Sequence, residues 1–202
     1  MVSVVSNIFQ EDTISEINSK LMTYPRKLDA EFGRLSTPVY GENQPIPRSG
    51  PLITQDVYSV LQSIIDTVST TAVPSYAMWV RYSPKYGTRT LPPHIDRNAC
   101  TYTIDYQLKS SVDWPIYINS EKVVLQDNQA AIYYGEDELH WRNEFPTRNH
   151  NDFVEMIFFH YVEPDHWSRH VEDQIAYRTS AEFSEFIRKK QDRLMSLYYW
   201  ER

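Results

Sequence analysis

Apolar residues recur at helical spacing in two segments near the start of the chain. This spacing predicts helices over residues 12–22 and 54–68, the first capped by Asp12 or Thr13. The apolar stripe of the first consists of Ile14, Ile17 and Leu21, and that of the second of Val57, Val60, Leu61, Ile64 and Ile65. Near the C-terminus, Thr179 and Glu182 form a capping box before another apolar stripe, so a third helix is expected there.

Between residues 76 and 162 the pattern changes to the period of two that is typical of strands. Residues 100–108 alternate, with Cys100, Tyr102 and Ile104 on one face and Thr103 and Asp105 on the other. The other expected strands are 76–82, 114–118, 122–125, 130–134 and 153–162. Because turn residues and not helices separate these strands, we expect antiparallel sheets packed as a barrel or sandwich.

A proline-rich segment from residue 24 to residue 51 interrupts the helical part. It contains five prolines and three glycines, which predict a long loop that borders a binding site. The 202 residues fit one domain. We expect N-terminal helices and a loop over 1–72, a β core over 73–163 and a helical extension over 164–202.

Composition and charge exclude several classes of protein. The net charge of −7 argues against nucleic-acid binding, which normally needs a basic face. The single cysteine, Cys100, excludes an intrachain disulfide and a cysteine-based zinc site. The N-terminal segment does not resemble a signal peptide, and no apolar run approaches the ~18 residues of a membrane span. A soluble cytoplasmic protein is therefore expected, without a membrane partner.

Candidate metal ligands occur at the end of one strand and after a later one. His94 and Asp96 are separated by one residue, and His140 follows the strand at 130–134 and the turn at Gly135. His150 and His160 are the rival third ligands. Two imidazoles and one carboxylate on one face of a metal leave positions open for Fe(II) to bind a cosubstrate and O₂. The same set of ligands also describes catalytic zinc sites.

Four stretches resemble a known family: VRYSPKYGTRTLPPHIDRNACTYT, DWPIY, IYYGEDELHWR and FFHYV. They are similar to small bacterial and phage Fe(II)/2-oxoglutarate-dependent dioxygenases, on the prolyl-4-hydroxylase-like branch. The resemblance covers roughly residues 76–162. It implies a double-stranded β-helix (jelly-roll) core and iron held by His94, Asp96 and His140. It also implies a hydroxylase that decarboxylates 2-oxoglutarate to succinate and CO₂, because related halogenases have a small residue in place of Asp96.

The resemblance is less direct for the cosubstrate. The family's basic residue on the strand after the distal histidine is absent from residues 153–155. Arg148 is our first candidate for the far carboxylate of 2-oxoglutarate, because guanidinium binds a carboxylate bidentately, and Arg142 and Arg81 are the alternatives. Tyr82 matches a family tyrosine that contacts the cosubstrate, and Tyr102 is expected to line the pocket.

Some alternatives remain open at this stage. Arg97 is a candidate for binding a substrate carboxylate or phosphate, or else forms a salt bridge. The substrate is a peptide side chain, a free amino acid or another small metabolite, and no oligomeric state is defined. The rival functions are a non-catalytic jelly-roll binding protein and a cupin-like metal hydrolase, for which Glu138 would be the general base.

Overall fold

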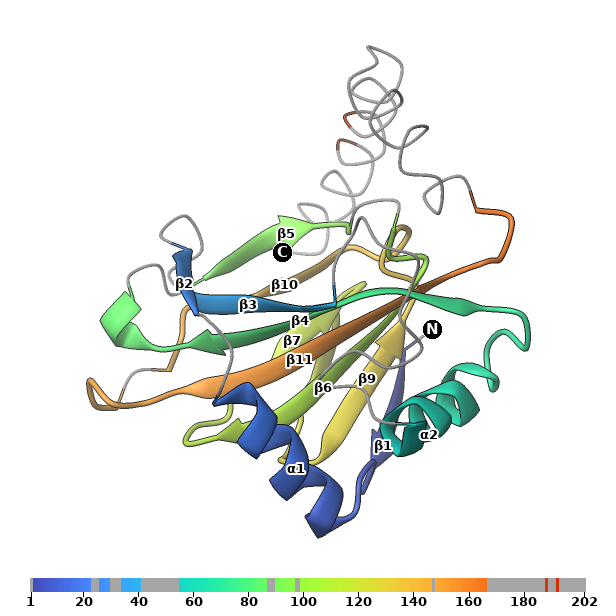
Figure 1. The fold of residues 1–202 in the computed structure, drawn as a ribbon. Coiled ribbons are helices and arrows are strands. Elements are labelled where there is room, and N and C mark those ends of the chain that lie inside the picture. The colour runs from blue at the N-terminus through green and yellow to red at the C-terminus, as the bar shows by residue number, and fades with distance from the viewer. Residues whose placement is uncertain are drawn as a thin grey trace.

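The fold was obtained as a computed structural model (Figure 1). It describes residues 2–22, 26–29, 34–40, 55–86, 90–96, 99–146, 148–166, 188 and 192. Helix α1 spans Glu11–Leu21, helix α2 spans Gln55–Ile65, and a 3-10 turn covers Pro84–Tyr86. The strands are β1 Ser3–Ser6, β2 Lys27–Asp29, β3 Arg34–Tyr40, β4 Val73–Tyr82, β5 Leu91–His94, β6 Tyr102–Ser110, β7 Ile116–Ile118, β8 Glu121–Val123, β9 Gln129–Tyr133, β10 His140–Arg142 and β11 Val154–Val162.

The strands form two antiparallel sheets. The large sheet has the order β1-β9-β6-β11-β4-β3-β2 and the small sheet the order β5-β10-β7-β8. Val80, Val154 and Met156 of the large sheet share a buried cluster with Ile116 and Ile118 of the small sheet. The interior between the sheets is thus apolar at this end, as expected when two sheets pack face to face.

Both helices cover the outer face of the large sheet, on the side away from β5 and β10 (Figure 1). Ile17 and Leu21 of α1 and Leu61 and Ile65 of α2 belong to one buried cluster with Trp79, Ile104 and Ile157 of the sheet. Trp79 on β4 therefore faces the helices, while its neighbour Val80 faces the interior. Alternation along one strand separates the helix-covered face from the face that lines the site.

The predicted mainly β fold with two packed sheets is confirmed, and the predicted helices of the first third correspond to α1 and α2. The expectation that residues 24–51 form only a loop is wrong, because β2 and β3 lie within them. Strand β3 accommodates Pro38 beyond the residues that pair with β2 and next to a register shift against β4. A proline disturbs a ladder least at such a position.

Two other predictions involve residues outside this description. Of the expected C-terminal helix at 179–194 only Arg188 and Asp192 are described, and Arg97 lies outside the described residues. No helix within the described part of the chain is long and apolar enough to cross a membrane.

Candidate metal centre and cosubstrate pocket

Strand pairing brings the two candidate histidines together. His94 ends β5 and His140 begins β10, and their Cα atoms are direct partners in the antiparallel pair. Side chains of direct cross-strand partners lie on the same face of the sheet, and the two imidazole centroids are 4.3 Å apart. Asp96 follows β5, where its backbone N–H donates to the carbonyl of Gly135 at 2.8 Å.

The donor atoms of His94, Asp96 and His140 all lie within 4.8 Å of one another. The Asp96 Oδ1 atom is 3.6 Å from His140 Nε2 and 4.0 Å from His94 Nε2. The Nδ1 atom of His94 is 2.8 Å from the Pro92 carbonyl, and that of His140 is 2.8 Å from the Glu138 carbonyl. Since a carbonyl only accepts, each Nδ1 donates and each Nε2 is left with a lone pair for a metal.

The electrostatics of these side chains also suit a cation. Burial and the neighbouring His140 lower the pKa of His94 to about 4, so this imidazole is neutral at neutral pH. Burial disfavours the charge of Asp96, but His140 outweighs it and lowers the pKa of Asp96 below its usual range. Burial likewise opposes the imidazolium form of His140, and Asp96 outweighs it and raises the pKa of His140. An ionised carboxylate beside two imidazoles fits a divalent metal.

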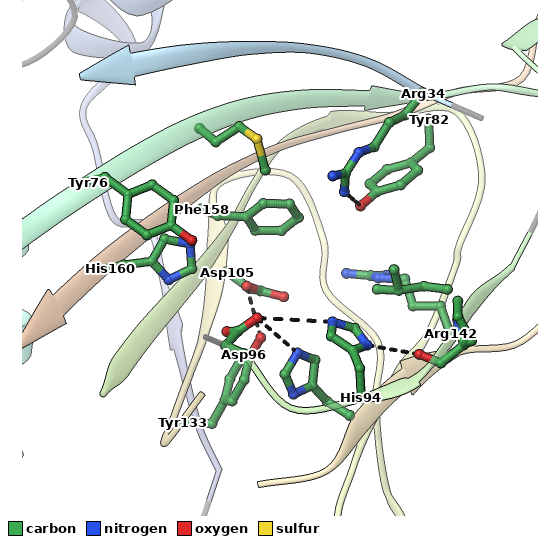
Figure 2. A pocket seen from close by; sticks show the side chains of 14 residues that line it. Arg34, Tyr76, Tyr82, His94, Asp96, Asp105, Tyr133, Arg142, Phe158 and His160 are labelled. Atoms are coloured by element: carbon green, nitrogen blue, oxygen red, sulfur yellow. Dashed lines mark hydrogen bonds and ion pairs between the residues drawn. The ribbon is translucent and has the colours of Figure 1, made fainter. Parts of the chain in front are cut away.

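The three side chains border a pocket of about 270 Å³ between the two sheets (Figure 2). Its other lining residues are Arg34, Tyr76, Met78, Tyr82, Leu91, Pro92, Asp105, Tyr133, Arg142, Phe158 and His160. The volume lies just below the range of roughly 300–1,000 Å³ typical of small-molecule pockets. The pocket therefore suits a compact ligand placed directly beside the metal ligands.

Arg142 reaches this pocket because it lies two residues after His140 on β10. Residues at this spacing share a strand face, and Figure 2 shows the Arg142 side chain entering the space that Asp96 and His94 border. Its side chain is 2% exposed, donates to the Trp114 carbonyl, and lies 5.0 Å over the Trp114 ring. The pocket thus contains a buried guanidinium that is already oriented.

Tyr82 also lines the pocket, as the resemblance implied, and Arg34 donates to its hydroxyl at 3.1 Å. Arg34 was not foreseen, since it lies in the segment expected to be a loop. Asp105 and Tyr133 were also missed, and the Tyr133 hydroxyl donates to Asp105 at 3.2 Å. Burial raises the pKa of Asp105 to about 6, although Arg142 acts against the rise.

Other predicted residues lie elsewhere. Arg148 is exposed and lines a separate hollow with Ser110, Asp113 and Asp127. Arg81 faces outward and pairs with Glu155 at 2.7 Å. The Tyr102 hydroxyl donates to Glu163 at 2.6 Å, and its ring packs on the cluster beneath the helices. The structure therefore does not bring these three side chains to the pocket.

The structure also shows where the alternative third ligands and the alternative general base lie. His150 is exposed in a turn. His160 is buried at the pocket wall, where its Nδ1 is 3.1 Å from the Thr103 hydroxyl. Glu138 accepts from the backbone N–H of Tyr134 at 2.9 Å and from Asn119 at 3.1 Å, and it is not a lining residue. A hydrolase mechanism with Glu138 as general base has no support from this position.

Gly135 packs directly against the ligand Asp96. A Cβ atom at Gly135 would lie 2.5 Å from Asp96 Oδ2 and 2.6 Å from the Cys100 carbonyl, and closer still to the Thr103 hydroxyl. Such separations are far inside van der Waals contact. Only glycine therefore lets the chain pass behind the Asp96 carboxylate.

Replacing Gly135 with alanine is expected to weaken metal binding by at least ~10-fold, because the added methyl displaces Asp96 from the two histidines. Isothermal titration of the metal-free protein with Fe²⁺ under anaerobic conditions measures the change. The same titration of Asp137→Ala, a variant in the same turn, serves as the control. An unchanged affinity in Gly135→Ala would show that Asp96 does not hold the metal.

Neither a protein-family model nor a curated protein matches the sequence. Solved structures do match, at low sequence identity. HygX from Streptomyces hygroscopicus, with nickel and 2-oxoglutarate bound, is 11% identical, covers 82% of this chain and 85% of its own, and gives a TM-score of 0.60. The non-heme alpha-ketoglutarate-dependent epimerase SnoN is 8% identical over 80% and 77%, with a TM-score of 0.60. A Trichoplax adhaerens prolyl hydroxylase bound to a hypoxia-inducible-factor peptide is 13% identical over 80% and 83%, with a TM-score of 0.55.

The chain thus has the fold of the Fe(II)/2-oxoglutarate-dependent oxygenases, and the predicted jelly-roll core is confirmed. The prolyl-4-hydroxylase-like branch stays a prediction, because an epimerase of this fold matches as well as the prolyl hydroxylase does.

Proposed function

We propose that this protein is an iron- and 2-oxoglutarate-dependent oxygenase that hydroxylates an aliphatic C–H bond. One observation supports this above the others: His94, Asp96 and His140 converge in a pocket that also contains the buried Arg142 guanidinium. The cluster supplies the two imidazoles and the single carboxylate that suit Fe(II). The guanidinium supplies a partner for a carboxylate placed a short distance from the metal.

In this proposal each residue has a defined task. His94, Asp96 and His140 hold the iron, and Arg142 binds the far carboxylate of 2-oxoglutarate, with Tyr82 and Arg34 beside it. When bound, iron and 2-oxoglutarate supply the oxidation, in which O₂ is consumed and the cosubstrate becomes succinate and CO₂. The two sheets keep water away from the reacting atoms. Asp96 favours hydroxylation over halogenation, since it keeps a carboxylate in the metal's coordination.

The substrate class follows less directly. The solved structures of this fold include one with hygromycin B, one with a peptide fragment and one with nogalamycin RO. We propose an amino acid, a peptide side chain or another small metabolite as substrate. It would approach beside His94, whose side chain is 30% exposed and so the most accessible of the three ligands.

The direct test is anaerobic purification followed by addition of Fe²⁺ and 2-oxoglutarate, and measurement of binding and of succinate after exposure to O₂. We expect one iron, bound 2-oxoglutarate and slow succinate formation even without substrate. Retention of zinc together with no binding of 2-oxoglutarate would favour the metal hydrolase instead. Binding of 2-oxoglutarate without any succinate would favour a non-catalytic binding protein.

The charge of Asp105 gives a pH-dependent prediction. Asp105 is 3% exposed and shares the pocket with Arg142, and burial raises its pKa to about 6. Above this pKa the carboxylate repels the dianionic cosubstrate, and below it the protonated form does not. Asp105→Asn should therefore lower the KM for 2-oxoglutarate by a few-fold at about pH 7.5, and the difference from wild type should vanish below about pH 6.

Initial rates of succinate formation across this pH range measure the ratio of the two KM values. Asp113→Asn, in the hollow of Arg148, is the control and should leave the ratio near one at every pH. A ratio that grows as the pH falls would contradict the assignment, because protonation of Asp105 can only reduce the difference.

A further inference from the structure

The two oxygens of the Asp96 carboxylate have different surroundings. Oδ1 faces the Nε2 atoms of His94 and His140, at 4.0 Å and 3.6 Å. Oδ2 accepts a hydrogen bond from the Thr103 hydroxyl at 3.0 Å. Thr103 lies on β6 and is fully buried, so water does not compete for this bond. The protein thus distinguishes the oxygen that faces the metal from the one that does not.

The hydrogen-bond directions around Thr103 follow from counting protons. The Thr103 hydroxyl has one hydrogen, and the ionised Asp96 can only accept, so that hydrogen goes to Oδ2. The 3.1 Å contact between the Thr103 hydroxyl and His160 Nδ1 then requires Nδ1 to donate. His160 therefore orients the Thr103 hydroxyl, and this hydroxyl in turn orients the Asp96 carboxylate.

The backbone makes this chain of bonds rigid. His160 on β11 and Thr103 on β6 are direct partners in the antiparallel ladder. The Tyr76 ring lies 4.3 Å from the His160 ring at 30°, which restricts the imidazole plane (Figure 2). Gly135 packs closely against both partners of the Thr103–Asp96 bond, since a Cβ atom there would lie 2.5 Å from Asp96 Oδ2 and closer still to the Thr103 hydroxyl.

We propose that Thr103 and His160 are positioning residues that restrict Asp96 to binding the metal through one oxygen. This inference rests on the proposed function, because its purpose is to leave room for a cosubstrate that chelates through two atoms. Without the Thr103 hydroxyl, the carboxylate can turn and present both oxygens. A carboxylate bound through both oxygens fills one more position, so chelation by 2-oxoglutarate weakens while the metal itself stays bound.

A second metal ion is the competing explanation for this region. Donor atoms of Asp96, Cys100 and His160 also lie within 4.8 Å of one another. However, the Thr103 hydroxyl already bonds to both Asp96 and His160, and the Tyr76 hydroxyl is 3.1 Å from Cys100 Sγ. Hydrogen bonds account for these polar atoms. We therefore expect one ion per chain, and two tightly bound ions would overturn the proposal.

The test compares Thr103→Val with the matched variant Thr103→Ser in the full-length protein. Affinity for Fe²⁺ is measured by titration, and affinity for 2-oxoglutarate is measured separately through the visible absorption of the anaerobic complex. We expect the valine variant to bind 2-oxoglutarate at least ~10-fold more weakly with unchanged or tighter metal binding, and the serine variant to restore wild-type behaviour. A parallel loss of both affinities, or no loss of either, would overturn the proposal.

His160 provides the second arm. His160→Asn keeps a donor near the position of Nδ1 and should resemble wild type, whereas His160→Leu should resemble Thr103→Val. The double variant Thr103→Val with His160→Leu should be no worse than either alone, because the two residues act through one chain of bonds. Additive losses would show that His160 does not act through Thr103.

A cobalt-substituted protein separates this inference from the proposed function. The visible spectrum of Co²⁺ responds to the number of ligand atoms and needs no cosubstrate. The Co²⁺ spectrum of Thr103→Val should differ from that of the wild type, and the spectrum of Thr103→Ser should match it. A Thr103→Val spectrum identical to the wild type would overturn the positioning role. Failure of the wild type to bind 2-oxoglutarate, with the cobalt result as expected, would instead contradict the proposed function alone.

Discussion

Replacing His140 with alanine is expected to lower the affinity for Fe²⁺ by at least ~100-fold and to abolish succinate formation. His140 is 2% exposed, and its Nδ1 is held by the Glu138 carbonyl, so its Nε2 has one orientation toward Asp96. Removing it leaves a two-ligand site in which the Asp96 carboxylate faces a cavity. Anaerobic titration with Fe²⁺ and a coupled succinate assay measure the two effects.

His150→Ala is the matched control, because His150 is an exposed histidine ten residues further along the chain. It should keep wild-type affinity and rate. His140→Gln fills more of the space and separates loss of a ligand from loss of packing, since it should keep the melting temperature and still lose the metal. Full metal binding in His140→Ala with loss in His150→Ala would mean that the third ligand has been misassigned.

The positions of the three candidate metal ligands were predictable because they depend on local sequence and on strand pairing. His94 and Asp96 lie at a strand end, and the glycine turn at Gly135 brings the chain back so that His140 pairs with His94. Only the strand end at His94 and the turn at Gly135 are needed to predict that His140 lies beside His94. The donor cluster could therefore be predicted without knowledge of the complete sheet order.

Of the predicted basic residues, Arg142 and not Arg148 lines the pocket, and the reason is geometric. Arg148, eight residues after His140, was the first candidate because guanidinium binds a carboxylate bidentately, yet it lines another hollow. Strand alternation is the better guide, since Arg142 lies at the second position after His140 and shares its face. The sequence contained this signal, although β10 is only three residues long and is not recognisable as a strand by itself.

The face of β6 that lines the pocket was also predictable in principle. Thr103 and Asp105 form the polar face of the strand, and Tyr102 and Ile104 the apolar one. Asp105 of the polar face lines the pocket, and Ile104 of the apolar face lies under α1 and α2. Tyr102 was expected at the pocket because it lies on the strand after the metal motif, whereas its face of the strand packs on the cluster beneath the helices.

Arg34 could not have been found from the sequence. It lies in a segment rich in proline and glycine, which gives no period, and β3 forms only because β4 offers an edge for it. The Arg34 guanidinium donates to the Tyr82 hydroxyl because Arg34 and Tyr82, 48 positions apart in the sequence, are direct partners in the β3–β4 pair. Contacts that depend on such distant pairing have no local signal.

Replacing Arg142 with methionine is expected to raise the KM for 2-oxoglutarate by at least ~100-fold, since two charge-assisted hydrogen bonds of roughly 1.5–3 kcal/mol each are lost. Methionine keeps part of the apolar packing against Trp114 and Met156, which the guanidinium contacts at present. Fe²⁺ affinity should change little, because Arg142 is not a metal ligand. Arg142→Lys keeps the charge without the bidentate geometry, so its KM for 2-oxoglutarate should lie between those of the wild type and Arg142→Met.

The design must separate cosubstrate binding from the stability of the pocket. Loss of Arg142 leaves the buried Asp105 without its nearby cation, so the double variant Arg142→Met with Asp105→Asn removes both charges and should recover stability but not the KM. Arg148→Met is the control and should leave the KM unchanged. If Arg142→Met keeps a low KM and Arg34→Met raises it, the carboxylate partner is Arg34 together with Tyr82.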